Sequence, residues 1–283
     1  MQKPGFIEKL KFFRPRRYIF GRHGRNPLIR RLGRWMEKNA EAYRNIDRNM
    51  GRNGEVWLMK MLARHFAANN SAGHKDAEPF VAFDVGANSG EWSSYMYHLD
   101  PTAEIHAFEL VPDTFQRLQQ SLGGVGNIHC RPFGLSNKKA RVEIFLNSSS
   151  ETAGLFSRVG LSAPDTITGE VQTGADYMAA EKIARIDLLK IDTEGAEKIV
   201  LEGFGAHLKN NMIDVIYFEY GEFNIAARTL LQDFYTLLGD YEIGRLMPAW
   251  VEFGPYDKNL EDFRAANYVA VRRDRQDLIK LLG

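Results

Sequence analysis

The chain has 283 residues, 44% of them apolar and 26% charged, with a formal net charge of +1. This composition is typical of a globular protein, and no apolar run approaches the roughly 20 residues that a membrane-spanning helix needs. A single cysteine, Cys130, cannot form an intramolecular disulfide, and basic residues interrupt every candidate signal sequence at the N-terminus. We therefore expect a cytoplasmic protein.

The charge is unevenly distributed. Residues 1–34 hold eleven Lys and Arg against one acidic residue, Glu8, so this arm carries +10 and the other 249 residues carry −9. Such an arm favours a polyanionic partner, either an anionic membrane surface at the inner face of the membrane or a nucleic acid. The alternative is a solvated arm that only covers the acidic remainder of the chain.

The expected elements begin with two helices, at about 27–42 and 54–69, the first amphipathic. From residue 80 onward, short apolar runs alternate with helical stretches, which indicates βαβ units and a parallel sheet. Strands are expected at 80–85, 104–109, 127–131, 141–146, 187–192 and 214–219, followed by short strands at 241–245, 250–253 and 267–271, the final pair antiparallel. Helices are expected at 91–98, 113–122, 195–201 and 224–238. Residues 147–169 show no clear periodicity, and a loop this long predicts a substrate-facing lid.

The strongest motif is the turn D-V-G-A-N-S-G, which begins at Asp84 between an expected strand and an expected helix. Glycines there let the backbone approach a ligand, and the helix start aims free amides at it. Glu109 ends the next strand, the usual place for a carboxylate that accepts hydrogen bonds from ribose. The dinucleotide fingerprint G-x-G-x-x-G is absent, because Gly86 and Gly90 are four apart with Asn88 between them. The motif therefore predicts an adenosine-type ligand, such as S-adenosylmethionine (SAM), whose sulfonium is cationic.

A second group of carboxylates follows two later strands. Asp192 ends one strand, Glu194 stands two residues further at the start of a helix, and Glu219 ends the next strand. Ligands of open α/β sheets bind outside the carboxyl ends of the strands, so these side chains are expected at the same crevice as the turn. Acids at helix starts are also ordinary capping residues, which is the favoured interpretation of Glu197.

Four blocks together resemble the FkbM family of SAM-dependent methyltransferases: D-V-G-A-N-S-G from Asp84, Phe108-Glu109, G-L-S from Gly134, and L-K-I-D-T-E-G-A-E from Leu189. The resemblance covers about residues 80–272. It implies an α/β fold with a Rossmann-like, seven-stranded, mostly parallel sheet and helices on both faces. It also implies SAM as cofactor and O-methylation of a hydroxyl on a sugar, a glycoconjugate or a secondary metabolite.

By position in the family's motifs, Gly86, Asn88 and Gly90 would line the methionine part of SAM, and Glu109 would bind the ribose. Asp84 and Asp192 flank this region and are expected at the cofactor as well. The acidic residue that often approaches the adenine in such folds is replaced here by P-F-G at 132–134. Adenine contacts are therefore expected from the backbone and from Phe133.

Methyl transfer to a hydroxyl needs alignment of the acceptor and a group that takes its proton. Asp192, Glu194 and Glu219 are the candidate catalytic acids, with Asp192 expected closest to the transfer. Asp192 and Glu219 could alternatively hold a magnesium ion, although a metal is not favoured. None of the histidines in this region ends an expected strand, and structural roles are expected for His98, His106, His129 and His207.

The sequence thus predicts a basic N-terminal extension over 1–53, helical in part, and a methyltransferase domain with its leading helix over 54–283. An O-methyltransferase acting on a carbohydrate or small molecule is the leading hypothesis. One alternative is an RNA or protein methyltransferase that grips its substrate with the Arg-rich arm. Another is a non-catalytic adaptor that binds the cofactor.

Overall fold

The computed structural model describes residues 23–71, 79–146, 153–157 and 165–283, in two compact units, 1–46 and 47–283. The described part of the first unit is the predicted amphipathic helix, α2 (Pro27–Tyr43), which begins with a proline after the capping residue Asn26. None of its residues is buried, and Leu28 and Trp35 are 75% and 62% exposed. Residues 1–22 of the basic arm lie outside the described residues. Every helix in the described part of the chain is too short or too polar to span a membrane.

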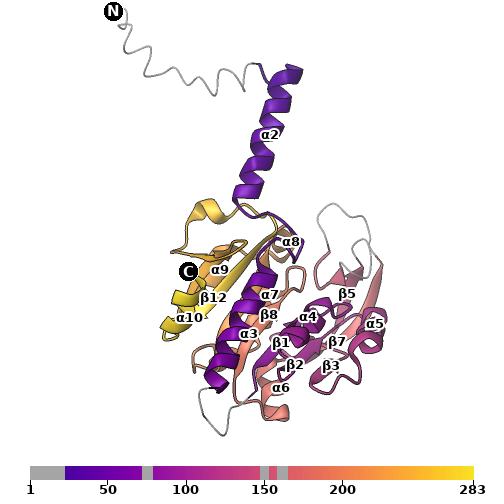
Figure 1. Cartoon of the computed structure of the whole chain (residues 1–283). Coiled ribbons are helices and arrows are strands. Elements are labelled where there is room, and N and C mark those ends of the chain that lie inside the picture. The colour runs from indigo at the N-terminus through magenta and orange to yellow at the C-terminus, as the bar shows by residue number, and fades with distance from the viewer. Residues whose placement is uncertain (1–22, 72–78, 147–152, 158–164) are drawn as a thin grey trace, which may run out of the picture. The chain divides into compact units, whose positions relative to one another are not determined.

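The second unit is built on a sheet of eight strands in the order β11-β10-β12-β9-β8-β1-β2-β3. Figure 1 labels β12, β8, β1, β2 and β3 of this sheet. The strands are β1 (Val81–Val85), β2 (Glu104–Phe108), β3 (Ile128–Arg131), β8 (Ile186–Ile191), β9 (Ile213–Tyr220), β10 (Tyr241–Leu246), β11 (Val251–Phe253) and β12 (Ala266–Arg272). Strands β3, β2, β1, β8 and β9 are parallel, while β12 runs antiparallel to both β9 and β10. The predicted α/β fold with a mostly parallel sheet is confirmed, but the sheet has eight strands instead of the expected seven. The expected antiparallel pairing of 250–253 with 267–271 is wrong, because β11 and β12 each pair antiparallel with β10, which lies between them.

Helices cover both faces of this sheet, as predicted. One core lies under α3 (Glu55–Ser71), α4 (Glu91–Leu99), α5 (Pro112–Leu122) and α10 (Gln276–Leu282), and Figure 1 shows α3 and α4 across the same face. The opposite core lies under α6 (Gly174–Glu181), α7 (Glu197–Glu202), the short helix η3 (Gly205–Leu208) and α9 (Leu231–Leu237). Strands β1 and β8 are buried along their whole length, which explains why their sequences are apolar apart from Asp84, Asp187 and Lys190.

The expected strand at 141–146 forms, but it does not belong to the main sheet. It is β5 (Ala140–Leu146), which pairs antiparallel with β7 (Thr166–Gln172) and β6 (Ala153–Gly154); β4 (Gly134–Leu135) completes a second sheet in the order β4-β7-β5-β6. The expected structureless loop 147–169 is therefore wrong in part, because β6 and the start of β7 lie within it. Residues 147–152 and 158–164 of that loop lie outside the described residues.

Two expected helices have other boundaries in the structure, and some elements were not expected. The expected helix at 224–238 is two helices, α8 (Phe223–Ala227) and α9, because Arg228 adopts a left-handed conformation with φ of 54° and ends α8. Helix α7 begins at Glu197 instead of Gly195, since Glu194 and Gly195 both have positive φ. The helices α6 and α10, and the turn η4 (Lys258–Leu260), were not predicted.

Candidate active site

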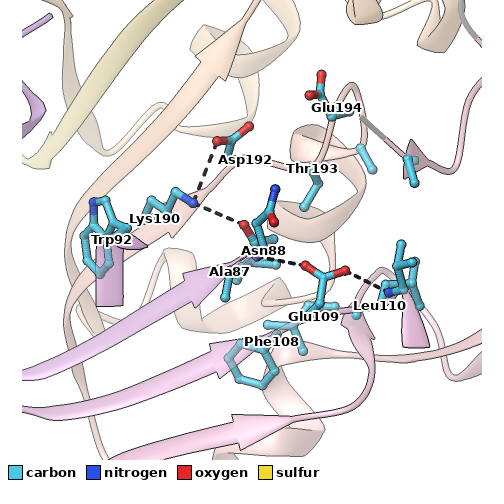
Figure 2. A pocket seen from close by; sticks show the side chains of 18 of the residues that line it. Ala87, Asn88, Trp92, Phe108, Glu109, Leu110, Lys190, Asp192, Thr193 and Glu194 are labelled. Carbon is cyan, nitrogen blue, oxygen red and sulfur yellow. Dashed lines mark hydrogen bonds and ion pairs between the residues drawn. The ribbon is translucent and has the colours of Figure 1, made fainter. Parts of the chain in front are cut away.

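A cavity of about 420 Å³ opens where the carboxyl ends of β1, β2 and β8 meet. The chain leaves β1 toward β2 on one side and returns to β8 on the other, and such a switch point is where open α/β sheets bind ligands. Predicted residues that line it are Gly86, Asn88, Glu109, Asp192 and Glu194, together with the apolar side chains of Val85, Phe108, Leu110 and Leu135. Figure 2 shows part of this lining.

The turn after β1 holds three strand ends together. Gly86 has a φ of +82°, and a Cβ at this position would overlap the backbone oxygen of Asp192, so no other residue fits. The Asp192 amide donates to the carbonyl of Val85 at 2.9 Å, and the Gly86 amide donates to the carbonyl of Phe108 at 3.0 Å. Gly86 therefore serves the cavity by bringing the ends of β1, β2 and β8 into backbone contact.

Glu109 is nearly buried at the cavity wall, with 7% of its surface exposed. Its carboxylate accepts hydrogen bonds from the amides of Asn88 at 2.9 Å and Val111 at 2.8 Å, and both bonds are visible in Figure 2. Burial raises the pKa of Glu109, and these two amides oppose the shift. The carboxylate thus ties the loops after β1 and β2 together, and each oxygen retains a lone pair for a ligand hydroxyl.

Three residues expected at the cofactor are not among the residues that line the cavity: Asp84, Gly90 and Phe133. Gly90, with φ of +90°, precedes α4, and a Cβ there would collide with Leu118 and Leu122 of α5, so this glycine permits close helix packing. The ring of Phe133 packs against Phe108, with 5.8 Å between ring centroids. Gly90 and Phe133 therefore contribute to packing next to the residues that line the cavity.

Asp84 is fully buried and forms an ion pair with Lys190. Lys190 on β8 donates to the carboxylate of Asp84 at 2.9 Å, and the hydroxyl of Ser93 donates to its other oxygen at 2.7 Å. Lys190 itself lines the cavity and lies 3.8 Å from Asp192 (Figure 2). Burial lowers the pKa of Lys190, but Asp84 and Asp192 outweigh it and raise the pKa above its ordinary value. The sequence signal for this role is a lysine within a mostly apolar strand, to which the motif alone assigns no function.

A second, smaller cavity of about 140 Å³ adjoins the first. It is called here the carboxylate chamber and is lined by Asp47, Arg48, Asn53, Glu55, Asp192, Glu194, Tyr217, Glu219, Ala265 and Asn267. Arg48, Glu55, Asp192 and Glu194 line both cavities. The three candidate catalytic acids are thus brought together, with Asp192 and Glu194 at the junction and Glu219 inside the chamber.

The carboxylates of the chamber disfavour one another's ionisation. Burial, followed by repulsion from Asp192 and Glu197, raises the pKa of Glu194 to about 8. Burial and the charges of Asp192 and Glu194 also raise the pKa of Glu219 well above its ordinary value, and the charge of Arg48 opposes this shift. A cation placed here would relieve this repulsion, so the chamber favours positive charge at its entrance.

Sequence reasoning missed the other residues of the chamber, among them the titratable side chains of Arg48, Glu55 and Tyr217. Burial raises the pKa of Glu55, and its hydrogen bonds with Asn53 and Tyr217 oppose that shift. Arg48 forms an ion pair with Glu222 at 3.1 Å. Arg48 and Glu55 precede the first strand by about thirty residues, so no motif connected them with the sheet edge.

The family model described as "Methyltransferase FkbM domain" matches residues 84–250, more than half of the chain. The chain belongs to the FkbM methyltransferase family. The resemblance found in the sequence is confirmed, and this FkbM protein is a SAM-dependent methyltransferase.

Curated relatives of the FkbM protein are methyltransferases as well. "Methyltransferase 1" of Beauveria bassiana is 27% identical, covering 56% of this chain and 74% of its own. "2-O-methyltransferase NoeI" of Sinorhizobium fredii is 23% identical, covering 61% and 76%. "Hexuronic acid methyltransferase AglP" of Haloferax volcanii is 27% identical, covering 53% and 60%.

Proposed function

We propose that this FkbM methyltransferase methylates a hydroxyl of a sugar, a glycoconjugate or a secondary metabolite. The observation that carries the proposal is the junction of the two cavities, where Asp192 and Glu194 face both the larger cavity and the carboxylate chamber. A hydroxyl-rich acceptor in the chamber would find carboxylate and amide groups that accept and donate hydrogen bonds. The names of two relatives, a 2-O-methyltransferase and a hexuronic acid methyltransferase, support the same class of acceptor.

The larger cavity fits SAM by the chemistry of its lining. Asn88 and Glu109 would hold the ribose side, and Leu110 and Leu135 offer apolar contacts for the adenine. Asp192 and Glu194 would face the cationic sulfonium, whose role is to supply an activated methyl group. Asp84, Gly90 and Phe133 would act indirectly, by fixing Lys190, α4 and Phe108.

Asp192 would be the group closest to the transfer, as general base for the acceptor hydroxyl. Its side chain is 45% exposed at the junction of the cavities, so an acceptor can reach it. Nζ of Lys190 lies 3.8 Å from one carboxylate oxygen of Asp192 and attracts that oxygen electrostatically. Glu219, whose pKa is raised well above its ordinary value, would supply a hydrogen bond to the acceptor in its neutral form, while Glu194 would face the sulfonium. A magnesium ion between Asp192 and Glu219 is the alternative role for this pair.

The proposal is tested by incubating the full chain with SAM and a panel of sugars, uronic acids, nucleotide sugars and an RNA pool, with S-adenosylhomocysteine formation measured by mass spectrometry. Methylation of a sugar hydroxyl is expected, and Asp192→Asn should lower turnover by a factor of about 100 to 10,000. Asp176→Asn on the exposed side of α6 is the control. Turnover by Asp192→Asn within about threefold of the parent, with and without a chelator, would exclude both roles for Asp192. Turnover with RNA alone would favour the rival substrate.

We further propose that residues 1–34 attach the protein to an anionic membrane surface. The start of helix α2 supports this, because it exposes Leu28 and Leu32 next to Arg30, Arg31 and Arg34. Just beyond this segment, Trp35 and Met36 continue the exposed apolar stripe at helical spacing. An apolar stripe flanked by arginines is typical of helices that lie in the lipid interface.

A further inference from the structure

Three side chains of metal-ligand type gather on the edge strands β2 and β3. Glu104 and His106 are two residues apart on β2 and so point to the same face of the sheet. His129 pairs with His106 in the parallel register of β3, and the two rings stack with 4.7 Å between centroids. None of the three lines either cavity of the candidate active site. The cluster is therefore a feature separate from the methyltransferase site.

The distances within this cluster suit a tetrahedral ion. Oε1 of Glu104 lies 3.2 Å from Nε2 of His106 and 3.6 Å from Nε2 of His129, and all three ligand atoms lie within 4.8 Å of one another. Zinc bonds to nitrogen and oxygen are about 2.0–2.2 Å long, which places neighbouring tetrahedral ligands roughly 3.3–3.6 Å apart. A small movement of the exposed side chains would bring all three onto one ion.

Hydrogen bonds already orient the imidazole of His106, the buried member of the cluster. Nδ1 of His106 lies 2.7 Å from the hydroxyl oxygen of Tyr177, which accepts a hydrogen bond from Nε of Arg131 at 2.8 Å. Metal-bound histidines commonly donate their other ring N–H to an oxygen. The Tyr177 oxygen has two lone pairs and can accept from both Arg131 and Nδ1–H of His106, which leaves Nε2 free to ligate.

The cluster combines a fixed ligand with accessible ones. The side chain of His106 is 1% exposed, whereas those of His129 and Glu104 are 36% and 37% exposed, so an ion can enter from solvent. Cys130 follows His129 but packs into the opposite core, on the α3 and α4 side of the sheet. The donor set is thus two imidazoles and one carboxylate, with room for water.

We propose that Glu104, His106 and His129 form a binding site for a divalent transition-metal ion, of which Zn²⁺ suits the donor set best. Imidazole ligands select zinc and its neighbours over magnesium or calcium. The ion crosslinks β2 to β3, the outermost strand of the parallel part of the sheet. This site refines the structural role that the sequence predicted for His106 and His129.

The test uses the full chain, stripped of metals with EDTA and returned to chelator-free buffer. One equivalent of Co²⁺ should produce visible absorption bands of a low-coordinate site, and Zn²⁺ should displace it while millimolar Mg²⁺ does not. Zn²⁺ should also raise the Tm, since only the native chain brings the ligands together. Glu104→Gln and His129→Gln replace partly exposed side chains, so both variants should fold and lose affinity for Zn²⁺ by about tenfold or more.

His98→Gln provides the matched control, because His98 is an exposed histidine on α4 and should leave Zn²⁺ affinity unchanged. Saturable binding that both ligand variants weaken would establish the site. The absence of saturable Co²⁺ or Zn²⁺ binding by the parent, or equal affinity in the parent and His129→Gln, would overturn it. Neither readout depends on methyl transfer, so the outcome is independent of the proposed function.

Discussion

The buried ion pair between Lys190 and Asp84 should dominate the stability of the active-site floor. Its atoms lie 2.9 Å apart, and the side chains are 6% and 0% exposed. With an effective dielectric constant of about 20, the gross attraction is ~6 kcal/mol, and removal of one partner leaves an uncompensated buried charge at a cost of about 3–5 kcal/mol. Lys190→Met and Asp84→Asn should each lower the free energy of unfolding by about 3–5 kcal/mol. For a unit of this size, the loss corresponds to a Tm decrease of roughly 6–20 °C.

A double-mutant cycle in urea, followed by circular dichroism, measures the coupling. The double variant Lys190→Met with Asp84→Asn should be more stable than either single variant, because it buries no unpaired charge. Lys198→Met on α7 is the control, since its pair with Glu202 is about one-third exposed on both sides and is worth at most about 1 kcal/mol. If the two single effects simply add in the double variant, the pair is not coupled and the reasoning fails.

Three further predictions concern the cofactor site and the arm. Glu109→Gln should weaken SAM binding by about 1–3 kcal/mol, because an amide NH₂ would face a backbone N–H donor. Unchanged affinity by calorimetry would show that Glu109 does not bind the ribose. Gly86→Ala should abolish SAM binding and lower the Tm through the clash with Asp192, whereas Gly33→Ala, with nothing near its Cβ, should do neither. Deletion of residues 1–34 should preserve SAM affinity but abolish salt-sensitive sedimentation with anionic liposomes. RNA binding without liposome binding by the full chain would support the rival partner.

Much of the fold could be predicted because the central strands are buried on both faces. Strands β1 and β8 read as short apolar runs that end in Asp84-Val-Gly and Lys-Ile-Asp192, and their positions follow from βαβ alternation. The second sheet could not be predicted in this way. Its strands β4 and β6 have two residues each, and β5 has the sequence of any half-buried strand, so nothing local shows which sheet it joins.

The residues of the candidate site also fall into those that local sequence predicts and those that depend on tertiary packing. Asp192, Glu194 and Glu219 could be predicted as neighbours because the carboxyl ends of adjacent parallel strands must meet. Arg48 and Glu55 depend on how α3 and the segment before it pack against the sheet, which is a tertiary property. Asp84 shows a different limit: its place before the glycine turn predicts contact with the cofactor, whereas in the structure it is buried, bound to Lys190 and not among the residues that line the cavity.

Binding of SAM next to Glu194 should release protons from the carboxyl of this residue. Because the pKa of Glu194 is about 8, its carboxyl is mostly protonated at pH 7.5. A sulfonium cation in the adjoining cavity favours the ionised form and lowers this pKa, so SAM binding should release roughly half a proton. S-adenosylhomocysteine carries no sulfonium charge and should release much less.

Calorimetry of both ligands at pH 7.5, in buffers of different ionisation enthalpy, measures the number of protons released. By linkage, the affinity for SAM should rise as the pH increases through about 8, since the ionised carboxylate attracts the cation, while the affinity for S-adenosylhomocysteine changes little. Glu194→Gln should reduce the difference between the ligands, and Glu143→Gln on an exposed position of β5 should leave it intact. Equal proton release for the two ligands would show that the sulfonium does not lie near Glu194, and the placement of the methyl group at the junction would have to be abandoned.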